Sequence, residues 1–242
     1  PEYFEEGFGS MAKDANQRAL SLVYKLSSGN KLSLNGQIDR IDMTEDGRYF
    51  MVMDYKTGNA AINIMDVYYG IKLQLLTYLL VTKQFLSAQQ GEEALPVGML
   101  YYFLKQPRAS LASHGESQQE VIAALEKKLL MPGWIVADKE LVQLIDSTLS
   151  QPGAKSRFIH ATMKKGGDLM ANATYLRQPR ELELLLEYVE ELLQHTGRDI
   201  LAGRIAPVPY RNREGHSTCE YCNYRAICGF DAQLEGFGYR RV

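Results

Sequence analysis

The chain reads Gly36-Gln37-Ile38-Asp39-Arg40-Ile41-Asp42 and then, after a turn at Asp46-Gly47, Tyr49-Phe50-Met51-Val52-Met53-Asp54-Tyr55-Lys56-Thr57-Gly58. Apolar and β-branched residues on both sides of a Gly-containing turn predict an antiparallel hairpin. Because side chains alternate faces along a strand, Asp54 and Lys56 point the same way and Tyr55 points the other way. Asp39 lies on the partner strand, where it reaches the same spot. The hairpin is therefore expected to bring two carboxylates and one ammonium together at a strand end.

This trio suits the metal-dependent hydrolysis of phosphodiesters. Carboxylate oxygens bind Mg²⁺ or Mn²⁺, which keeps water ligands and contacts substrate phosphates. The ion lowers the pKa of its bound water and offsets charge on the phosphorus. We predict Asp39, Asp54 and Tyr55 at the metal, and Lys56 as the group that orients the attacking water or neutralises the transition state. The alternative is a surface hairpin in which Asp54 and Lys56 form an ordinary ion pair.

A helix is expected after the hairpin. Apolar residues recur at helical spacing from Val67 onward, which predicts a helix from Asp66, as its N-cap, to about Ala88. Gln74 and Tyr78 are four residues apart and therefore share one face of this helix. Tyr78 also fits a plain core position, whereas Gln74 is harder to explain as a core residue.

The rest of the chain predicts an α/β fold. Pro96 to Lys105 is a nearly continuous apolar run, which is typical of a central strand buried on both faces. Further elements are expected at these places: a strand over 3–9; a hairpin over 19–42 that turns at Ser28-Gly29-Asn30 and returns from Lys31 to Asp42; helices over 121–130, 139–149 and 179–201; and a basic hairpin tip at 164–168. Pro132-Gly133-Trp134 is expected only to separate two of the helices.

Three cysteines lie close together near the C-terminal end. Cys219, Cys222 and Cys228 have a spacing at which thiolates hold either a [4Fe–4S] cluster or Zn²⁺. Both groups prefer four protein ligands, and the chain contains only these three cysteines. His216 precedes Cys219 by three residues and would complete a Cys₃His zinc site. The remaining alternative is three buried free cysteines.

The composition sets limits on the class of protein. A hydrophobic content of 45% is ordinary for a globular core. No apolar run reaches the ~18 residues that suggest a membrane span, and no secretory signal is visible at the start. The net charge of −2 does not advertise nucleic-acid binding, so basic residues that contact phosphates must be grouped locally. Two such groups occur, at 155–165 and 198–225. Three clustered cysteines do not form an even disulfide framework, which fits a cytoplasmic origin. Because the chain begins with Pro1 and not Met, we expect it to be a piece of a longer protein.

The ordered set Asp39, Asp54-Tyr55-Lys56 and Gln74-x-x-x-Tyr78 resembles the RecB-like branch of the PD-(D/E)xK nuclease superfamily. The sequences GQIDRID, MDYKTG and YYGIKLQLLTYLL are similar to the C-terminal nuclease domain of AddB-type subunits of helicase–nucleases, and the similarity continues to the cysteine segment. The resemblance implies a restriction-endonuclease-like core, with a central mixed sheet flanked by helices. It also implies that Gln74 and Tyr78 lie beside the active site as part of the catalytic set.

The resemblance further implies an activity and its setting. The chain would be the Mg²⁺-dependent DNA exonuclease domain of an ATP-dependent helicase–nuclease, a phosphodiester hydrolase acting on single-stranded DNA. Its partner would be a subunit of AddA type, and its role would be double-strand-break repair and recombination in the bacterial cytoplasm, associated with the nucleoid. Cys219, Cys222 and Cys228 would bind a [4Fe–4S] cluster whose fourth cysteine lies upstream of this chain.

We expect a nuclease domain over 1–203, with its core at about 17–105 and helical additions over 115–203. An extended segment over 204–242 would carry the cysteine cluster and pack back on the core. Two other functions compete with the exonuclease. One is a catalytically inert, nuclease-like module that binds DNA or a partner subunit. The other is a stand-alone RecB-like nuclease of Cas4 type.

Overall fold

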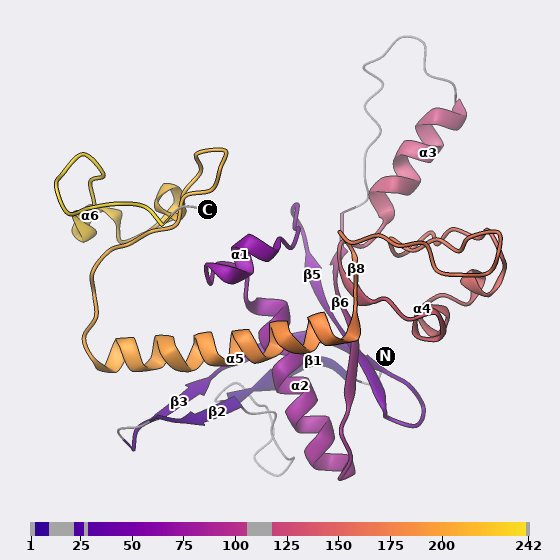
Figure 1. The fold of residues 1–242 in the computed structure, drawn as a ribbon, viewed down its shortest axis with the longest axis horizontal. Coiled ribbons are helices and arrows are strands. Elements are labelled where there is room, and N and C mark those ends of the chain that lie inside the picture. Colours follow the sequence, from indigo (N-terminus) through magenta and orange to yellow (C-terminus); the bar gives the residue numbers. More distant parts are fainter. Residues whose placement is uncertain (1–2, 10–21, 27–28, 106–117, 241–242) are drawn as a thin grey trace.

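A six-stranded mixed sheet forms the centre of the protein (Figure 1). The computed structural model describes residues 3–9, 22–26, 29–105 and 118–240. The strand order is β1-β4-β5-β6-β7-β8, with parallel pairing between β5 and β6 and between β7 and β8, and antiparallel pairing elsewhere. The strands are β1 (Tyr3–Phe8), β4 (Gly36–Met43), β5 (Tyr49–Lys56), β6 (Leu95–Phe103), β7 (Gly133–Val136) and β8 (Leu176–Arg177).

Helices cover both faces of this sheet, as the α/β prediction requires. They are α1 (Ile64–Tyr68), α2 (Gln74–Gln90), α3 (Gln118–Leu129), α4 (Lys139–Ile145), α5 (Pro179–Leu201) and the short α6 (Arg225–Cys228). One apolar core lies between the sheet and helices α2 and α5, and it includes Val52. A second core on the opposite face includes Met51, Met53 and Val142 of α4. The alternation along β5 thus feeds two cores, which explains its continuous apolar run.

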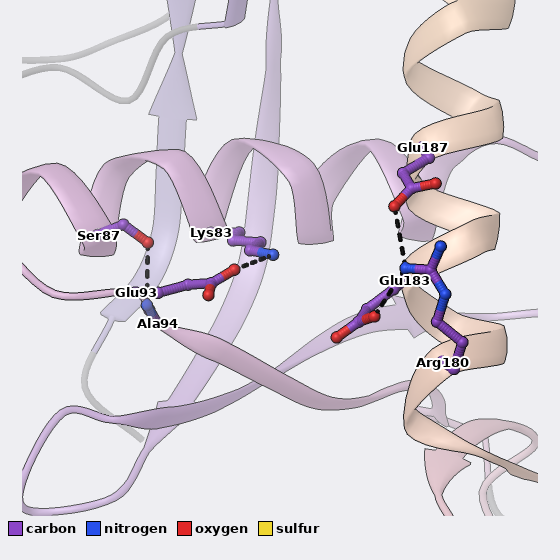
Figure 2. A network of polar contacts seen from close by, with 7 residues as sticks. All are labelled: Lys83, Ser87, Glu93, Ala94, Arg180, Glu183 and Glu187. Carbon is purple, nitrogen blue, oxygen red and sulfur yellow. Dashed lines mark hydrogen bonds and ion pairs between the residues drawn. The ribbon is translucent and has the colours of Figure 1, made fainter.

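Figure 2 shows the polar contacts around the place where α5 passes α2. Lys83 Nζ lies 2.7 Å from Glu93 Oε1, and Arg180 pairs with Glu183 and Glu187 along α5. Glu93, Glu183, Glu187 and Glu190 line a groove of about 560 Å³ between the two helices. Excess negative charge makes this groove a poor path for a DNA strand.

The helix predicted from Asp66 to Ala88 is two helices. Asn63, not Asp66, is the N-cap of α1, and its side chain accepts a hydrogen bond from Met65 N at 2.8 Å. The chain then turns at Gly70, whose φ of +78° suits glycine, and α2 begins at Gln74. Helical spacing runs through the turn, so periodicity alone missed the break.

The predicted return strand from Lys31 to Asp42 is also divided. β2 (Leu22–Lys25) and β3 (Lys31–Leu34) pair as a separate two-stranded ribbon, which confirms the hairpin; residues 19–21 and Ser28 lie outside the described residues. The chain enters the central sheet only at Gly36. The Phe8 ring covers Gly36 so closely that a Cβ there would lie 2.6 Å from it. This close approach explains the glycine at the point where the chain changes sheets.

Two further differences follow from turn chemistry. The segment expected only to separate helices contains β7, which pairs with β6 and β8. The helix predicted over 139–149 stops at Ile145, because the Asp146 side chain accepts hydrogen bonds from Thr148 N and Thr148 Oγ1 and starts a 3₁₀ turn instead. The basic turn at 164–168 is confirmed, with Lys164 N donating to Asp168 O at 2.7 Å. None of the helices among the described residues is long and apolar enough to cross a lipid bilayer.

Gly133 permits a close contact between β7 and β6, and its replacement tests the sheet. A Cβ at Gly133 would lie 2.1 Å from Met99 O and 2.8 Å from Leu100 Cα, and its φ is +152°. We expect Gly133→Ala to lower the free energy of unfolding by about 2–4 kcal/mol, through backbone strain and overpacking. Urea denaturation measures this change. Gly166→Ala is the control, because nothing lies within 4 Å of its added Cβ; equal stabilities of the two variants would contradict the prediction.

Candidate active site

The β4–β5 hairpin brings the two predicted aspartates together. Arg40 is paired with Met53, so the same antiparallel register puts Asp39 across from Asp54. Asp39 Oδ2 accepts a hydrogen bond from the Tyr55 backbone N–H at 2.7 Å. This bond ties the Asp39 carboxylate to the end of β5, beside the Asp54 carboxylate.

Asp54 is a buried carboxylate with one incompletely satisfied oxygen. Only 2% of the residue is exposed, and its Oδ2 is ion-paired with Lys56 Nζ. Within the described residues, no donor meets that oxygen with hydrogen-bond geometry. Burial raises the pKa of Asp54, the Lys56 ammonium opposes this change, and the Asp39 charge adds to it. A buried carboxylate oxygen in this state is well suited to a cation.

Lys56 is held from the other side by α2. Its ammonium donates to Gln74 Oε1 at 3.1 Å, and Gln74 Nε2 donates to the Tyr78 hydroxyl at 2.9 Å. The predicted shared face of Gln74 and Tyr78 is therefore observed, and it points to the hairpin. Burial raises the pKa of Tyr78, the hydrogen bond from Gln74 lowers it, and the charges of Asp54 and Asp39 raise it further.

Tyr101 also belongs to this cluster, although its sequence context predicts only an apolar strand. The parallel β5–β6 register pairs it with Asp54, and its ring centroid lies 5.6 Å from Lys56 Nζ. Burial, followed by the Asp54 charge, raises the pKa of Tyr101 to about 12. The available signal was a pair of tyrosines near the end of a strand whose other residues are typical of a core.

Tyr55 faces away from the carboxylates, as strand alternation predicts. Its ring makes an edge contact with Tyr102, with centroids 5.7 Å apart. The Tyr55 N–H is already used by Asp39, so only its main-chain carbonyl remains for the predicted role at a metal. No group of three or more His, Cys, Asp or Glu side chains gathers around one point among residues 3–9, 22–26, 29–105 and 118–240. Asp39 and Asp54 fit Mg²⁺, which takes one or two carboxylates and completes its shell with water and phosphate.

The cysteine segment has a different character. Cys219 is half-buried, and Cys222 and Cys228 are exposed and free, so the alternative of three buried cysteines is wrong. His216 Nδ1 lies 3.4 Å from Glu220 Oε2. Within residues 204–240, which are fully described, Tyr210 is the only buried residue, so no core gathers the thiols. By themselves, the ligands of this chain do not assemble a four-ligand site.

A mixed sheet with an Asp-Tyr-Lys sequence at the end of a central strand, completed by a Gln and a Tyr from a flanking helix, defines a nuclease-like α/β protein. The sequence pattern described as "PD-(D/E)XK nuclease superfamily" matches residues 2–229. The chain belongs to this superfamily, whose nucleases generally use divalent metal ions.

Its relatives confirm the resemblance to AddB-type subunits. Over 238 residues the chain is 33% identical to the AddB-type subunit of the ATP-dependent helicase/deoxyribonuclease of Acetivibrio thermocellus, covering 97% of this chain and 20% of the relative. The corresponding subunits from Bacillus cereus (strain G9842) and Ruminiclostridium cellulolyticum are each 33% identical, covering 91% of this chain and 19% of each relative. The chain thus spans about a fifth of the length of these relatives.

Proposed function

We propose that this chain is a metal-dependent deoxyribonuclease domain that hydrolyses phosphodiesters of single-stranded DNA. One observation carries the proposal: Asp54 is buried beside Asp39, and one of its oxygens is paired with Lys56 but lacks a hydrogen-bond donor within the described residues. A structural aspartate in a core is normally satisfied by donors. An unsatisfied carboxylate oxygen next to a second carboxylate instead supports a role in binding Mg²⁺ or Mn²⁺.

In this mechanism Asp39, Asp54 and the Tyr55 carbonyl hold the metal ion. The ion, when bound, supplies an activated water and neutralises charge on the phosphate. Lys56 points its ammonium at the same place and stabilises the negative charge that develops on the phosphoryl oxygens. Gln74 fixes the direction of that ammonium, and Tyr78 fixes the Gln74 amide through its hydroxyl. The Tyr101 hydroxyl, whose pKa is about 12, stays protonated at neutral pH.

The names of the relatives support a wider proposal for a longer protein that contains this chain. Each relative is one subunit of an ATP-dependent helicase/deoxyribonuclease, so we infer that residues 1–203 form the nuclease domain of such a subunit. A helicase partner of AddA type would deliver one DNA strand to it, in cytoplasmic double-strand-break repair and recombination. Cys219, Cys222 and Cys228 would hold a [4Fe–4S] cluster only with a fourth ligand from outside this chain; Zn²⁺ with His216 is the alternative for the segment over 204–242.

A cleavage assay tests the proposed nuclease. The chain is incubated with end-labelled single-stranded DNA and with the matching duplex, in Mg²⁺, in Mn²⁺ or in EDTA. We expect cleavage of the single strand with either metal and none in EDTA, since metal assistance contributes several kcal/mol to such reactions. Restoring Mg²⁺ after EDTA should restore the cleavage. If the chain binds DNA but cuts neither substrate at high enzyme concentration with Mn²⁺, the binding-module alternative holds instead.

A further inference from the structure

The segment between Lys56 and Gln74 leaves the active site and returns to it. Its two ends are held together by the 3.1 Å hydrogen bond from Lys56 Nζ to Gln74 Oε1. Helix α1 lies within this excursion, and in Figure 1 it lies beside the end of β5 and the start of α2. Val67 anchors α1 in the core that adjoins Asp54's face of the sheet. Side chains on the outer surface of α1 therefore flank the approach to the candidate active site.

Tyrosines cluster on that outer surface. The Tyr68 ring lies parallel to the Tyr188 ring of α5, with centroids 5.8 Å apart and planes at 8°. The Tyr69 ring meets Tyr68 edge-on at 5.0 Å and stacks on Tyr210 at 4.2 Å. Tyr210 is buried, and Tyr69 and Tyr188 are half-buried, whereas 56% of Tyr68 is exposed. Tyr68 is thus the ring of this cluster that offers an open aromatic surface.

Packing does not explain why an exposed aromatic ring stands here. The Tyr188 hydroxyl donates to the main-chain oxygen of Tyr68 at 2.6 Å, so α5 holds the backbone of α1 independently of the Tyr68 ring. Val67, fully buried, supplies the apolar anchor. The Tyr68 ring therefore adds a rigid, preoriented surface to a helix that is already fixed.

The charge around the cluster suits a polyanion on one side. The Arg240 guanidinium carbon lies 5.7 Å from the Tyr69 ring centroid, while Asp66, the acidic residue of α1, is paired with Lys72 at 3.0 Å. The acidic groove between α2 and α5 lies at other residues of α5. Arg and aromatic rings side by side form the usual surface on which successive unpaired bases stack.

We propose that Tyr68 is a stacking site for an unpaired nucleobase of the DNA strand that leads to Asp39, Asp54 and Lys56. This inference rests on the proposed nuclease function and names how its substrate is held. Stacking tolerates every base, because each has a flat π-face. It excludes paired bases, whose faces are covered in the duplex. Tyr68 thereby gives the site a preference for single strands without any reading of sequence.

Binding measured without cleavage provides the first test. Fluorescence anisotropy in EDTA compares the affinity of a labelled single strand for wild type, Tyr68→Ala and Tyr68→Phe. We expect Tyr68→Ala to bind about 5- to 150-fold more weakly, as loss of one stacking ring does, and Tyr68→Phe to bind nearly as well as wild type. Tyr224→Ala is the matched control: Tyr224 is also exposed, but it lies in the cysteine segment. Equal affinities of wild type and a folded Tyr68→Ala variant would overturn the proposal.

Tyr68→Trp gives a second test that does not require loss of a side chain. The chain has one tryptophan, Trp134, and it is buried, so the introduced indole reports on its own surroundings. We expect the single strand to quench this fluorescence and the matching duplex to leave it unchanged. No quenching at saturating single strand would overturn the stacking site even if Tyr68→Ala folds poorly. Wild-type cleavage with Mg²⁺ is scored separately: cleavage without quenching rejects only the stacking site, and quenching without cleavage rejects only the nuclease.

Discussion

Replacing Asp54 with Asn is expected to lower the rate of single-stranded DNA cleavage by about 10³-fold, a loss of roughly 4 kcal/mol of transition-state stabilisation. The amide keeps the shape of the side chain but removes the negative charge that would bind the metal ion. End-labelled DNA in Mg²⁺ measures the rate, and a titration of Mg²⁺ and Mn²⁺ separates weaker metal binding from slower chemistry. Cleavage by Asp54→Asn at the wild-type rate would contradict the assignment.

The same substitution should have the opposite effect on stability when metal is absent. Burial raises the pKa of Asp54 in the folded state above its ordinary value of 3.8. The folded state therefore binds its proton more tightly than the unfolded state, and stability falls as the pH rises from about that value through the folded pKa. Asn cannot ionise, so Asp54→Asn should match wild type in acid and become the more stable protein at neutral pH. Thermal unfolding in EDTA at a series of pH values measures this difference.

Asp146 supplies the control, because it is also a buried aspartate. Although burial alone would raise its pKa, hydrogen bonds from Ser156 and Thr148 lower it. Its ionised form therefore stabilises the fold above the unfolded pKa and stops doing so as the pH falls through the folded pKa. We expect Asp146→Asn to lose stability at neutral pH while each folded molecule keeps its cleavage rate. The two aspartates thus separate a structural carboxylate from a functional one.

Local sequence patterns were sufficient to predict the hairpin of the candidate site. Alternation fixes which of Asp54, Tyr55 and Lys56 share a face, and the turn fixes the strand opposite. Helical spacing likewise places Gln74 and Tyr78 together. These relations involve residues that are close in sequence or joined by one turn, so few other arrangements satisfy them.

Relations that depend on distant pairing were not predictable in this way. Tyr101 joins the site only because β6 pairs in parallel with β5, in a register set by the two cores. β7 is four residues long and is stabilised by neighbours on both sides, which its own sequence does not reveal. The break between α1 and α2 depends on Gly70 and on the Asn63 cap, two local signals that the apolar periodicity outweighed.

Lys56→Met carries the second large expected effect, because it removes the ammonium but keeps the length of the chain. We expect cleavage to fall by about 10²–10³-fold, the loss typical of one positioned donor at a developing oxyanion. In the metal-free protein, the substitution also leaves the buried Asp54 carboxylate without its cation. Breaking a fully buried ion pair costs about 3–5 kcal/mol. Since Lys56 is 31% exposed, we expect a smaller decrease of about 1–2 kcal/mol in the free energy of unfolding.

A double-mutant cycle distinguishes this electrostatic cause from a packing defect. If the loss of stability in Lys56→Met comes from the stranded carboxylate, then Asp54→Asn added to it should restore the metal-free stability, while cleavage stays lost. A packing defect would instead leave the double variant as unstable as Lys56→Met, because both contain the same methionine. Lys72→Met is the matched control, since Lys72 pairs with Asp66 at a more exposed place, where an ion pair contributes little. Urea denaturation of the four proteins in EDTA therefore shows whether Asp54 and Lys56 act as one coupled unit, as hydrolysis at this site requires.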